Sequence, residues 1–176
     1  LLGAQFVGYE GVDKRIDVLA TAIRAKMTAV ELKDLDLAYA PPYSSAKDPV
    51  NMAGFMIDNI ANGTLKQWHL ADLESLPMDG SVTLLDARTV GEYRRGHIDG
   101  FLNIPVDDLR ERLNELDRSK PIYVICQSGL RSYIASRILE GNGFAAYNFS
   151  GGFRFYDTVI NDRALVESSF TCGMDK

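Results

Sequence analysis

Short apolar segments alternate with helix-forming segments from residue 64 onward, and this alternation constrains the fold more than any other feature of the sequence. The pattern predicts strands over residues 82–85, 102–104, 122–125 and 145–148, and helices over residues 89–95, 106–116, 130–140 and 152–160. Residues 122–125 are apolar throughout, as expected of a strand with both faces covered. Strands that alternate with helices at this spacing form parallel sheets. We therefore expect an α/β domain with a central parallel sheet flanked by helices.

The first 63 residues show a different pattern. It predicts a strand over residues 2–7, a helix over residues 13–26 capped by Asp13, a short helix that begins at the Thr28–Glu31 capping box, and a helix that begins at Asp48-Pro49 and ends at Asn62-Gly63. Two adjacent prolines exclude regular structure between Tyr39 and Tyr43. We place a domain boundary after Gly63, which gives residues 1–63, an α/β domain over residues 64–165 and a tail over residues 166–176.

Composition narrows the classes of function. The net charge is −5, from 19 Lys and Arg against 24 Asp and Glu, so a nucleic-acid or membrane-surface partner is not expected. No signal peptide is recognisable in the sequence, and it has no apolar run of the roughly 20 residues that span a bilayer. Two cysteines are too few for a disulfide scaffold and favour a reducing, cytoplasmic setting. The two histidines and two cysteines lack the spacing of metal ligands, so no metal is expected. Because the chain begins without Met inside an apolar run, we expect it to be part of a longer protein.

The segment that carries chemistry is the loop after the apolar strand at residues 122–125. The strand delivers Cys126 to the carboxyl end of the sheet, where α/β proteins bind ligands, and a helix follows at once. Backbone N–H groups of the loop and of the helix N-terminus are expected to face the sulfur and to favour its thiolate form. The same N–H groups could hold a persulfide sulfur. Cys126 is therefore the candidate nucleophile.

The residues that follow Cys126 form the candidate substrate-binding loop: Gln127, Ser128, Gly129, Leu130, Arg131 and Ser132. Arg131 offers a planar cationic fork to an anionic substrate, and Ser132 offers a hydroxyl. The alternative is that Cys126 is a small hydrophobic residue at a strand end, as buried free cysteines often are. The Gly-containing loop, the arginine and the immediate helix start fit a structural strand end less well.

This loop resembles the active-site loop of single-domain rhodaneses, which are sulfurtransferases. Further segments match in order: Leu84-Leu85-Asp86-Ala87-Arg88, Glu92-Tyr93, Gly96-His97-Ile98-Asp99-Gly100, Asn103-Ile104-Pro105 and Asn148-Phe149-Ser150-Gly151-Gly152-Phe153. The resemblance covers residues 64–162 and implies a rhodanese fold in which Cys126 carries sulfur as a persulfide. Phe101 departs from the family, in which a small Ala is usual at this position.

Loop length separates two functions within the resembling families. Sulfurtransferases carry four residues between the cysteine and the arginine, whereas related phosphatases and arsenate reductases carry five. This chain carries four, from Gln127 to Leu130, so sulfur transfer is favoured over phosphate or arsenate chemistry. The expected donors are a small-molecule or protein persulfide, a polysulfide or thiosulfate.

Three residues are assigned supporting roles, and Cys172 is assigned none. Asp86 is expected to brace the loop or a neighbouring helix, Arg88 to pair with a nearby acid, and His97 to be a hydrogen-bonded structural histidine. Cys172 lies in the tail, where nothing in the sequence places it near Cys126.

Residues 1–63 resemble the end of the dimerisation domain of pyridine-nucleotide–disulfide reductases, in the branch of the coenzyme A-disulfide and persulfide reductases. The matching segments are residues 2–8, 11–17 and 37–44. The resemblance implies an incomplete α+β fragment, a homodimer, and a parent that uses FAD, NAD(P)H and coenzyme A. No G-x-G-x-x-G occurs in the chain, so no cofactor is expected in the chain itself.

The same resemblance places a loop of the dimerisation domain in the partner's flavin site. It assigns Tyr39, Pro41 and Pro42 to that loop. Two readings of Tyr39 stay open: assistance to the partner's redox cysteine, or packing within a rigid proline turn.

Two hypotheses of different classes follow for the whole chain. In the first, the chain is a sulfurtransferase module that loads sulfur on Cys126 and serves the parent reductase domains. In the second, it is a non-catalytic module that dimerises and docks persulfidated partners.

Overall fold

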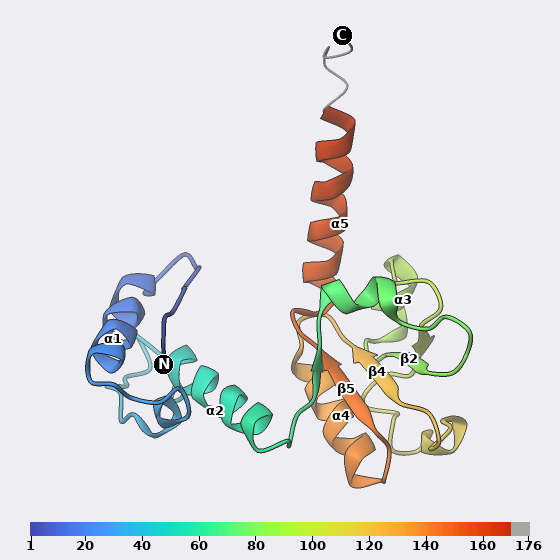
Figure 1. Cartoon of the computed structure of the whole chain (residues 1–176), viewed down its shortest axis with the longest axis horizontal. Coiled ribbons are helices and arrows are strands. Elements are labelled where there is room, and N and C mark those ends of the chain that lie inside the picture. The colour runs from blue at the N-terminus through green and yellow to red at the C-terminus, as the bar shows by residue number, and fades with distance from the viewer. Residues whose placement is uncertain (170–176) are drawn as a thin grey trace. The chain divides into compact units, whose positions relative to one another are not determined.

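The computed structural model describes the backbone of residues 1–169 and the side chains of residues 1–165 (Figure 1). The chain divides into two compact units, Leu1–Thr64 and a second unit that begins at Leu65. This division falls one residue after the boundary expected at Gly63. Within the described residues, no helix combines the length and the apolar character needed to cross a membrane. Cys172 lies outside the described residues.

The second unit is built on a five-stranded sheet in the order β1-β5-β4-β2-β3. The strands are β1 (Gln67–Trp68), β2 (Thr83–Asp86), β3 (Leu102–Asn103), β4 (Ile122–Ile125) and β5 (Ala146–Phe149). Every pairing between neighbours is parallel, which confirms the predicted α/β fold. β1 was not predicted from the sequence.

Side chains of the strands alternate between two hydrophobic clusters, one on each face of the sheet. In β4, Ile122 and Val124 join one cluster, whereas Tyr123 and Ile125 join the other. α4 (Leu130–Gly141) contributes Ala135 to the first cluster. α3 (Val90–Arg95) and α5 (Gly152–Ser169) lie in the second unit with the sheet (Figure 1) and contribute to the second cluster, which also holds the 3₁₀ helix η2 (Leu70–Ser75). Helices on both faces explain why the central strands are apolar.

The helix predicted over residues 106–116 is wrong. The segment consists of successive turns with i→i+3 bonds, such as Leu109 N–H to the Val106 carbonyl at 3.4 Å, and its regular part is the 3₁₀ helix η3 (Leu113–Glu115). The leucines on the predicted helical face do reach the core: Leu109 and Leu116 are buried and Leu113 packs against them. The spacing of three and four residues therefore predicted burial correctly, because a 3₁₀ turn also returns every third residue to one side.

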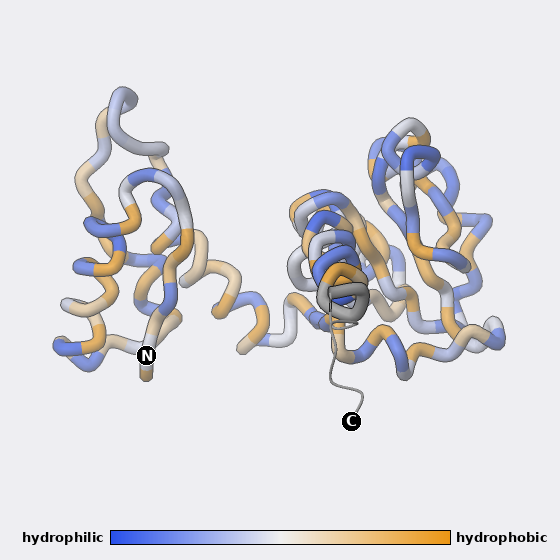
Figure 2. The backbone as a smooth tube through the Cα atoms, turned by 90° about the horizontal axis from the view of Figure 1, so that it is seen from above, coloured by the Kyte–Doolittle hydropathy of each residue, from blue (hydrophilic) through white to orange (hydrophobic). Residues whose placement is uncertain are grey.

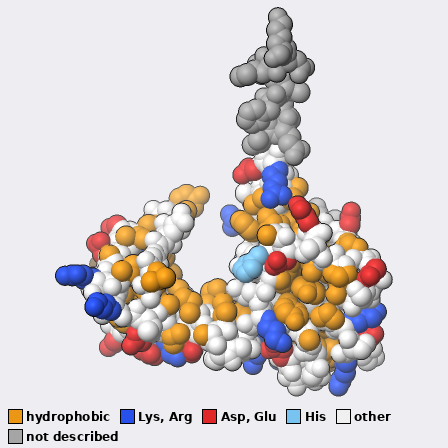
Figure 3. All heavy atoms as spheres, viewed as in Figure 1, with side chains coloured by type: hydrophobic (Ala, Val, Ile, Leu, Met, Phe, Trp, Pro, Cys, Tyr) orange, Lys and Arg blue, Asp and Glu red, His pale blue; other side chains and the backbone are white. Residues whose placement is uncertain are grey.

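The predicted helix over residues 152–160 is longer than expected. α5 runs to Ser169, so part of the predicted tail is helical. The acidic and basic side chains of the second unit are interspersed on the face shown in Figure 3, with hydrophobic groups gathered between them. No single sign of charge covers that face.

The first unit holds α1 (Val12–Arg24), the 3₁₀ helix η1 (Val30–Asp34) and α2 (Pro49–Ala61) around a small core of Leu19, Ala22, Leu32 and Val50. Hydrophobic and hydrophilic residues alternate along its helices in Figure 2, as expected of helices with one buried face. The Asn51 amide donates to the carbonyls of Leu32 at 3.1 Å and Leu35 at 2.9 Å, which fastens α2 to η1.

Two details of the first unit were wrongly predicted. Residues 2–7 form no strand, because none of the described residues pairs with them to complete a ladder. α1 has Gly11 at its N-cap in the left-handed conformation, so Asp13 lies in the first turn and does not cap the helix. There its carboxylate still faces the positive end of the helix dipole.

The other predicted helix starts in the first unit, and the predicted end of α2, agree with the structure. The Thr28–Glu31 box forms, with the Thr28 N–H donating to the Glu31 carboxylate at 2.6 Å. Asp48 caps α2, and Pro49 follows at the first helical position. Gly63 takes a φ of 76° after the end of α2, as a glycine terminus requires.

Candidate active site

Cys126 lies directly after β4, and α4 begins four residues later. The thiol is buried, with 1% of the residue exposed. Gly129 occupies the N-cap of α4 with a φ of 111°, a conformation that a residue with a Cβ rarely adopts. The glycine therefore lets the chain turn from the strand into the helix within a loop of this length.

The Cys126 sulfur accepts two hydrogen bonds. The backbone N–H of Gly129 donates at 3.1 Å, and the Ser132 hydroxyl donates at 3.2 Å. Ser132 is completely buried, and its hydroxyl also lies 3.1 Å from the Gly129 carbonyl. Because a hydroxyl has one proton, Ser132 can donate to the sulfur or to the carbonyl at any moment. The site thus offers one fixed donor and one switchable donor to an anionic sulfur.

The beginning of α5 holds the loop from the other side. The N–H of Phe153 donates to the Cys126 carbonyl at 2.7 Å, and that of Arg154 donates to the Gln127 carbonyl at 3.1 Å. Gly152 has a φ of 70°, and a Cβ there would lie 2.6 Å from backbone atoms of Gln127. Only glycine allows this approach, so Gly152 is a loop-positioning residue that the sequence reasoning did not assign. The Gly151-Gly152 pair in the sequence was the signal from which this role could have been inferred.

Arg131 is held by Glu92 of α3. Two guanidinium nitrogens donate to the two carboxylate oxygens at 2.7 and 2.6 Å, in the forked geometry typical of arginine and carboxylate. The Arg131 guanidinium, opposed by burial, lowers the pKa of Glu92 to about 2, and Glu92 in turn raises the pKa of Arg131. The cationic fork expected to face a substrate is therefore already occupied by a carboxylate of the same chain. Sequence reasoning missed Glu92 as a site residue.

Arg88 and Asp86 form a second pair, which is almost fully buried. The Arg88 guanidinium donates to both Asp86 oxygens, at 2.7 to 3.0 Å. It also donates to the Gly96 carbonyl at 2.8 Å and to the Gln127 side chain at 3.4 Å, and it stacks 3.9 Å from the centre of the Phe153 ring. The expected pairing of Arg88 with a nearby acid is thus present, and through Gln127 it reaches the cysteine loop.

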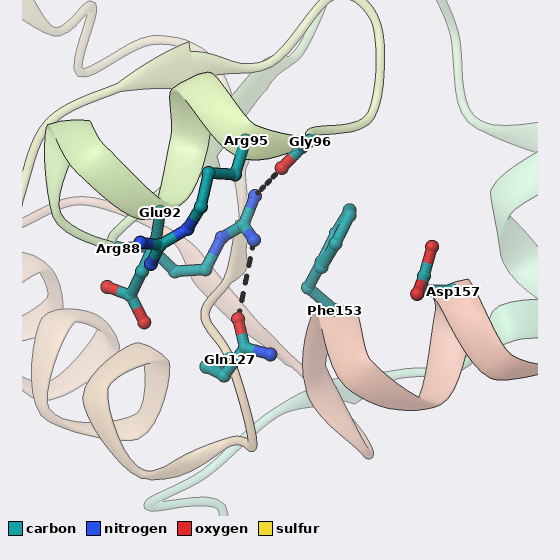
Figure 4. A pocket seen from close by; sticks show the side chains of 7 residues that line it. All are labelled: Arg88, Glu92, Arg95, Gly96, Gln127, Phe153 and Asp157. Atoms are coloured by element: carbon teal, nitrogen blue, oxygen red, sulfur yellow. Dashed lines mark hydrogen bonds between the residues drawn. The ribbon is translucent and has the colours of Figure 1, made fainter.

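A pocket of about 450 Å³ opens beside the loop. Figure 4 shows its lining: Arg88, Glu92, Arg95, Gly96, Gln127, Phe153 and Asp157. The Arg88 side chain points from the segment after β2 across the pocket to Gln127 and Gly96, while Phe153 and Asp157 project from α5 (Figure 4). Gln127 joins this pocket to the loop that carries Cys126.

The remaining predicted residues lie as follows. Leu130 is 66% exposed at the start of α4. The His97 Nδ1–H donates to the Tyr93 carbonyl at 3.1 Å, and the imidazole stacks on the Tyr93 ring, which fits the expected structural role. Phe101 is buried in the second cluster and stacks with Trp68. Cys126 and the predicted loop thus lie together, whereas His97 lies in the segment that follows α3.

Tyr39, Pro41 and Pro42 belong to the first unit. The prolines begin a turn over residues 41–43, as expected, and the Tyr39 side chain is 53% exposed. Among the described residues, no group of three His, Cys, Asp or Glu side chains is arranged to hold a metal ion.

The fold and the cysteine loop agree with the result of comparison with known families. Residues 69–157 match the rhodanese-like domain, which is half of the chain, and the chain belongs to the rhodanese-like family.

Particular relatives extend the similarity beyond this domain. The structure of reduced Bacillus anthracis CoADR-RHD matches 88% of the chain with 47% identity and a TM-score of 0.82, and a NAD-dependent persulfide reductase from A. fulgidus matches 85% with 42% identity and a TM-score of 0.71. Coenzyme A disulfide reductase of Staphylococcus aureus is 54% identical over 55 residues. The chain spans 28% and 26% of those solved chains and 13% of that reductase. The relatives thus support a C-terminal rhodanese part of such a reductase.

Proposed function

We propose that the second unit is a sulfurtransferase module in which Cys126 takes up sulfur as a persulfide. The observation that carries this proposal is the set of donors around the sulfur. Gly129 N–H and the Ser132 hydroxyl both point at Cys126 Sγ, which stabilises negative charge on that atom or on a sulfur attached to it. A cysteine that served only as a hydrophobic core residue would have no use for two such donors.

The transfer step is a displacement at sulfur. The Cys126 thiolate attacks the outer sulfur of a persulfide, R–S–SH, and the S–S bond of the donor breaks with its electron pair going to R–S⁻. The product, Cys126–S–SH, keeps the proton of the outer sulfur. Gly129 N–H and the Ser132 hydroxyl can hold the new terminal sulfur once it ionises.

We further propose that this module serves a flavin-dependent reductase of persulfides, polysulfides or coenzyme A disulfide, of which the chain is the C-terminal part. The identity to the relatives over both units supports this. In the second unit, the N-termini of α4 and α5 are engaged by the cysteine loop, and Thr89 closes that of α3 with its capping box. We propose that FAD, NAD(P)H and coenzyme A bind to other parts of the parent, which we expect to be a homodimer.

In that parent, Tyr39 would reach the flavin site of the partner subunit. Its exposed ring and the rigid turn at Pro41 and Pro42 support this role, because an exposed tyrosine at a fixed loop can project into a neighbouring protein. The alternative function is a non-catalytic module for dimerisation and docking, in which Cys126 only binds persulfidated partners.

One experiment separates the two functions. After incubation with a persulfide donor, intact-protein mass spectrometry should show a gain of about 32 Da, confined by peptide mapping to Cys126, and addition of a thiol acceptor should remove it. Cys126→Ser should lose the adduct and all but a few per cent of sulfur transfer while it stays folded, because a hydroxyl is nearly isosteric but a poor nucleophile. Transfer activity that survives this substitution would refute the mechanism, and an adduct that no acceptor removes would favour docking.

A further inference from the structure

We propose that Glu92 is a specificity-determining residue, which withdraws the only cation of the cysteine loop from the donor and thereby selects thiol-borne persulfides over the dianion thiosulfate. This inference rests on the proposed function, because it names the donor class of the same site. It differs from the expectation that Arg131 serves as a fork for an anionic substrate. The evidence is the geometry of the pair, the charge around the pocket and the chemistry of the two donors.

Glu92 is well placed to hold Arg131 permanently. Its carboxylate binds the guanidinium at two points, 2.7 and 2.6 Å, and also accepts from the Thr89 N–H at 3.0 Å and the Thr89 hydroxyl at 2.7 Å. The capping box therefore fixes the carboxylate before it meets Arg131. An incoming anion would have to displace a counter-charge that is anchored at its own helix N-terminus.

The other charged residues that line the pocket are balanced in sign. The charged residues that line the pocket are Arg88, Arg95, Glu92 and Asp157, and Arg88 and Glu92 are paired with Asp86 and Arg131. Their formal charges cancel. Arg88 is committed to Asp86 within the protein interior, and Arg95 shares the pocket with Asp157. A neutral site gives a dianion no net attraction to offset the water that it must lose.

The two donors differ in the charge that they bring to this site. Thiosulfate reacts as Cys–S⁻ + S–SO₃²⁻ → Cys–S–S⁻ + SO₃²⁻, so two negative charges must enter beside the thiolate and leave as sulfite. A persulfide on an uncharged thiol reacts as Cys–S⁻ + R–S–SH → Cys–S–SH + R–S⁻, with a single charge throughout. With Glu92 in place, the second reaction meets less repulsion.

The test compares both donors on the same protein. The rate of sulfur loading on Cys126 is measured for the 176-residue chain with thiosulfate and with 2-hydroxyethyl persulfide. In Glu92→Gln the amide can still accept from Thr89, but Arg131 is released. We expect the ratio of the thiosulfate rate to the persulfide rate to rise about tenfold, as for the gain of one charge at a partly exposed site. High salt should reduce that rise.

The chain offers a matched control. Arg112 binds Glu115 at two points, 2.6 and 2.7 Å, but neither residue lines the pocket. Glu115→Gln should leave the donor ratio unchanged. Glu92→Asp is a second variant that keeps the charge but is one methylene too short for both contacts, and it should raise the ratio by a smaller factor. Because each ratio is taken on one protein, a partial loss of folded molecules cancels.

The outcomes are distinct. If the wild-type chain loads no sulfur from either donor, the proposed function fails and the inference fails with it. If the wild-type chain loads sulfur but Glu92→Gln and Glu92→Asp both keep the donor ratio of the wild type, only the inference is overturned. An equal rise in Glu115→Gln would also overturn it, because the effect would then come from net charge alone.

Discussion

Two arginine–carboxylate pairs flank the cysteine loop, and they differ in their exposure to water. In the pair of Arg88 and Asp86, the side chains are 2% and 1% exposed, whereas in the pair of Arg131 and Glu92 they are 30% and 20% exposed. Both pairs have forked geometry and short contacts. The difference in burial therefore decides what each pair can do.

A buried pair is held by its surroundings, because each partner left alone would be a charge without water. Arg88 has no exchangeable partner: Asp86, Gly96 and Gln127 occupy its donors. In the open pair, water can cover whichever group loses its partner, so breaking this pair costs less stability. We infer that the buried pair fixes the structure of the site, whereas the open pair sets which donor the site accepts.

The largest expected effect comes from breaking the buried pair. Asp86→Asn leaves the Arg88 guanidinium in the interior without a counter-charge, and we expect the free energy of unfolding to fall by about 3–5 kcal/mol. The measurement is urea unfolding followed by the fluorescence of Trp68, the only tryptophan, which is buried in the second unit.

Glu115→Gln is the matched control for this substitution, because it removes one carboxylate from an exposed pair. Side chains there are 35% and 42% exposed, and the loss should stay below about 1 kcal/mol. A loss in Asp86→Asn no larger than this would show that burial does not separate the pairs.

The second effect is a pH dependence of the open pair. The pKa of Glu92 is lowered from 4.5 to about 2, mainly by Arg131. Because the folded protein holds this carboxylate ionised, its contribution to stability is complete above pH 4.5 and is lost as the pH falls toward 2. We expect the difference in unfolding free energy between wild type and Glu92→Gln to shrink over that range. A difference that stays constant between pH 5 and pH 2.5 would mean that the pair does not stabilise the fold.

The sequence predicted the cysteine loop well because its signals are local. The apolar strand, the Gly at position 129 and the helix start lie within ten residues, so no distant contact decides their structure. The same holds for the starts of α2 and α3, where the capping residues sit beside the helices that they begin. The segment 106–116 failed for the opposite reason. Its leucines are spaced for one buried face, and the choice between helix and turns depends on the core that they enter.

The candidate site required contacts that no local pattern shows. Glu92 and Arg131 are 39 residues apart and meet because β2 and β4 are neighbours, which places α3 beside the start of α4. Gly152 touches Gln127 only because β5 lies next to β4. The sequence suggested that Arg131 is a cation at the site. It could not show that the cation already has a partner.

The smallest effect on stability is expected for Arg131→Lys, and it is compared with the effect of Arg88→Lys. An ammonium keeps the charge in both variants but loses the fork. At Arg88 it cannot reach Asp86, Gly96 and Gln127 together, so buried acceptors are left unpaired and we expect a loss of about 1–3 kcal/mol. At Arg131 water replaces the missing contact, and the loss should be about 0.5 kcal/mol or less. Thiosulfate loading should also change little, because Glu92 still neutralises the ammonium. Equal losses of stability in the two variants, measured by the same urea unfolding, would mean that the open pair is as structural as the buried one.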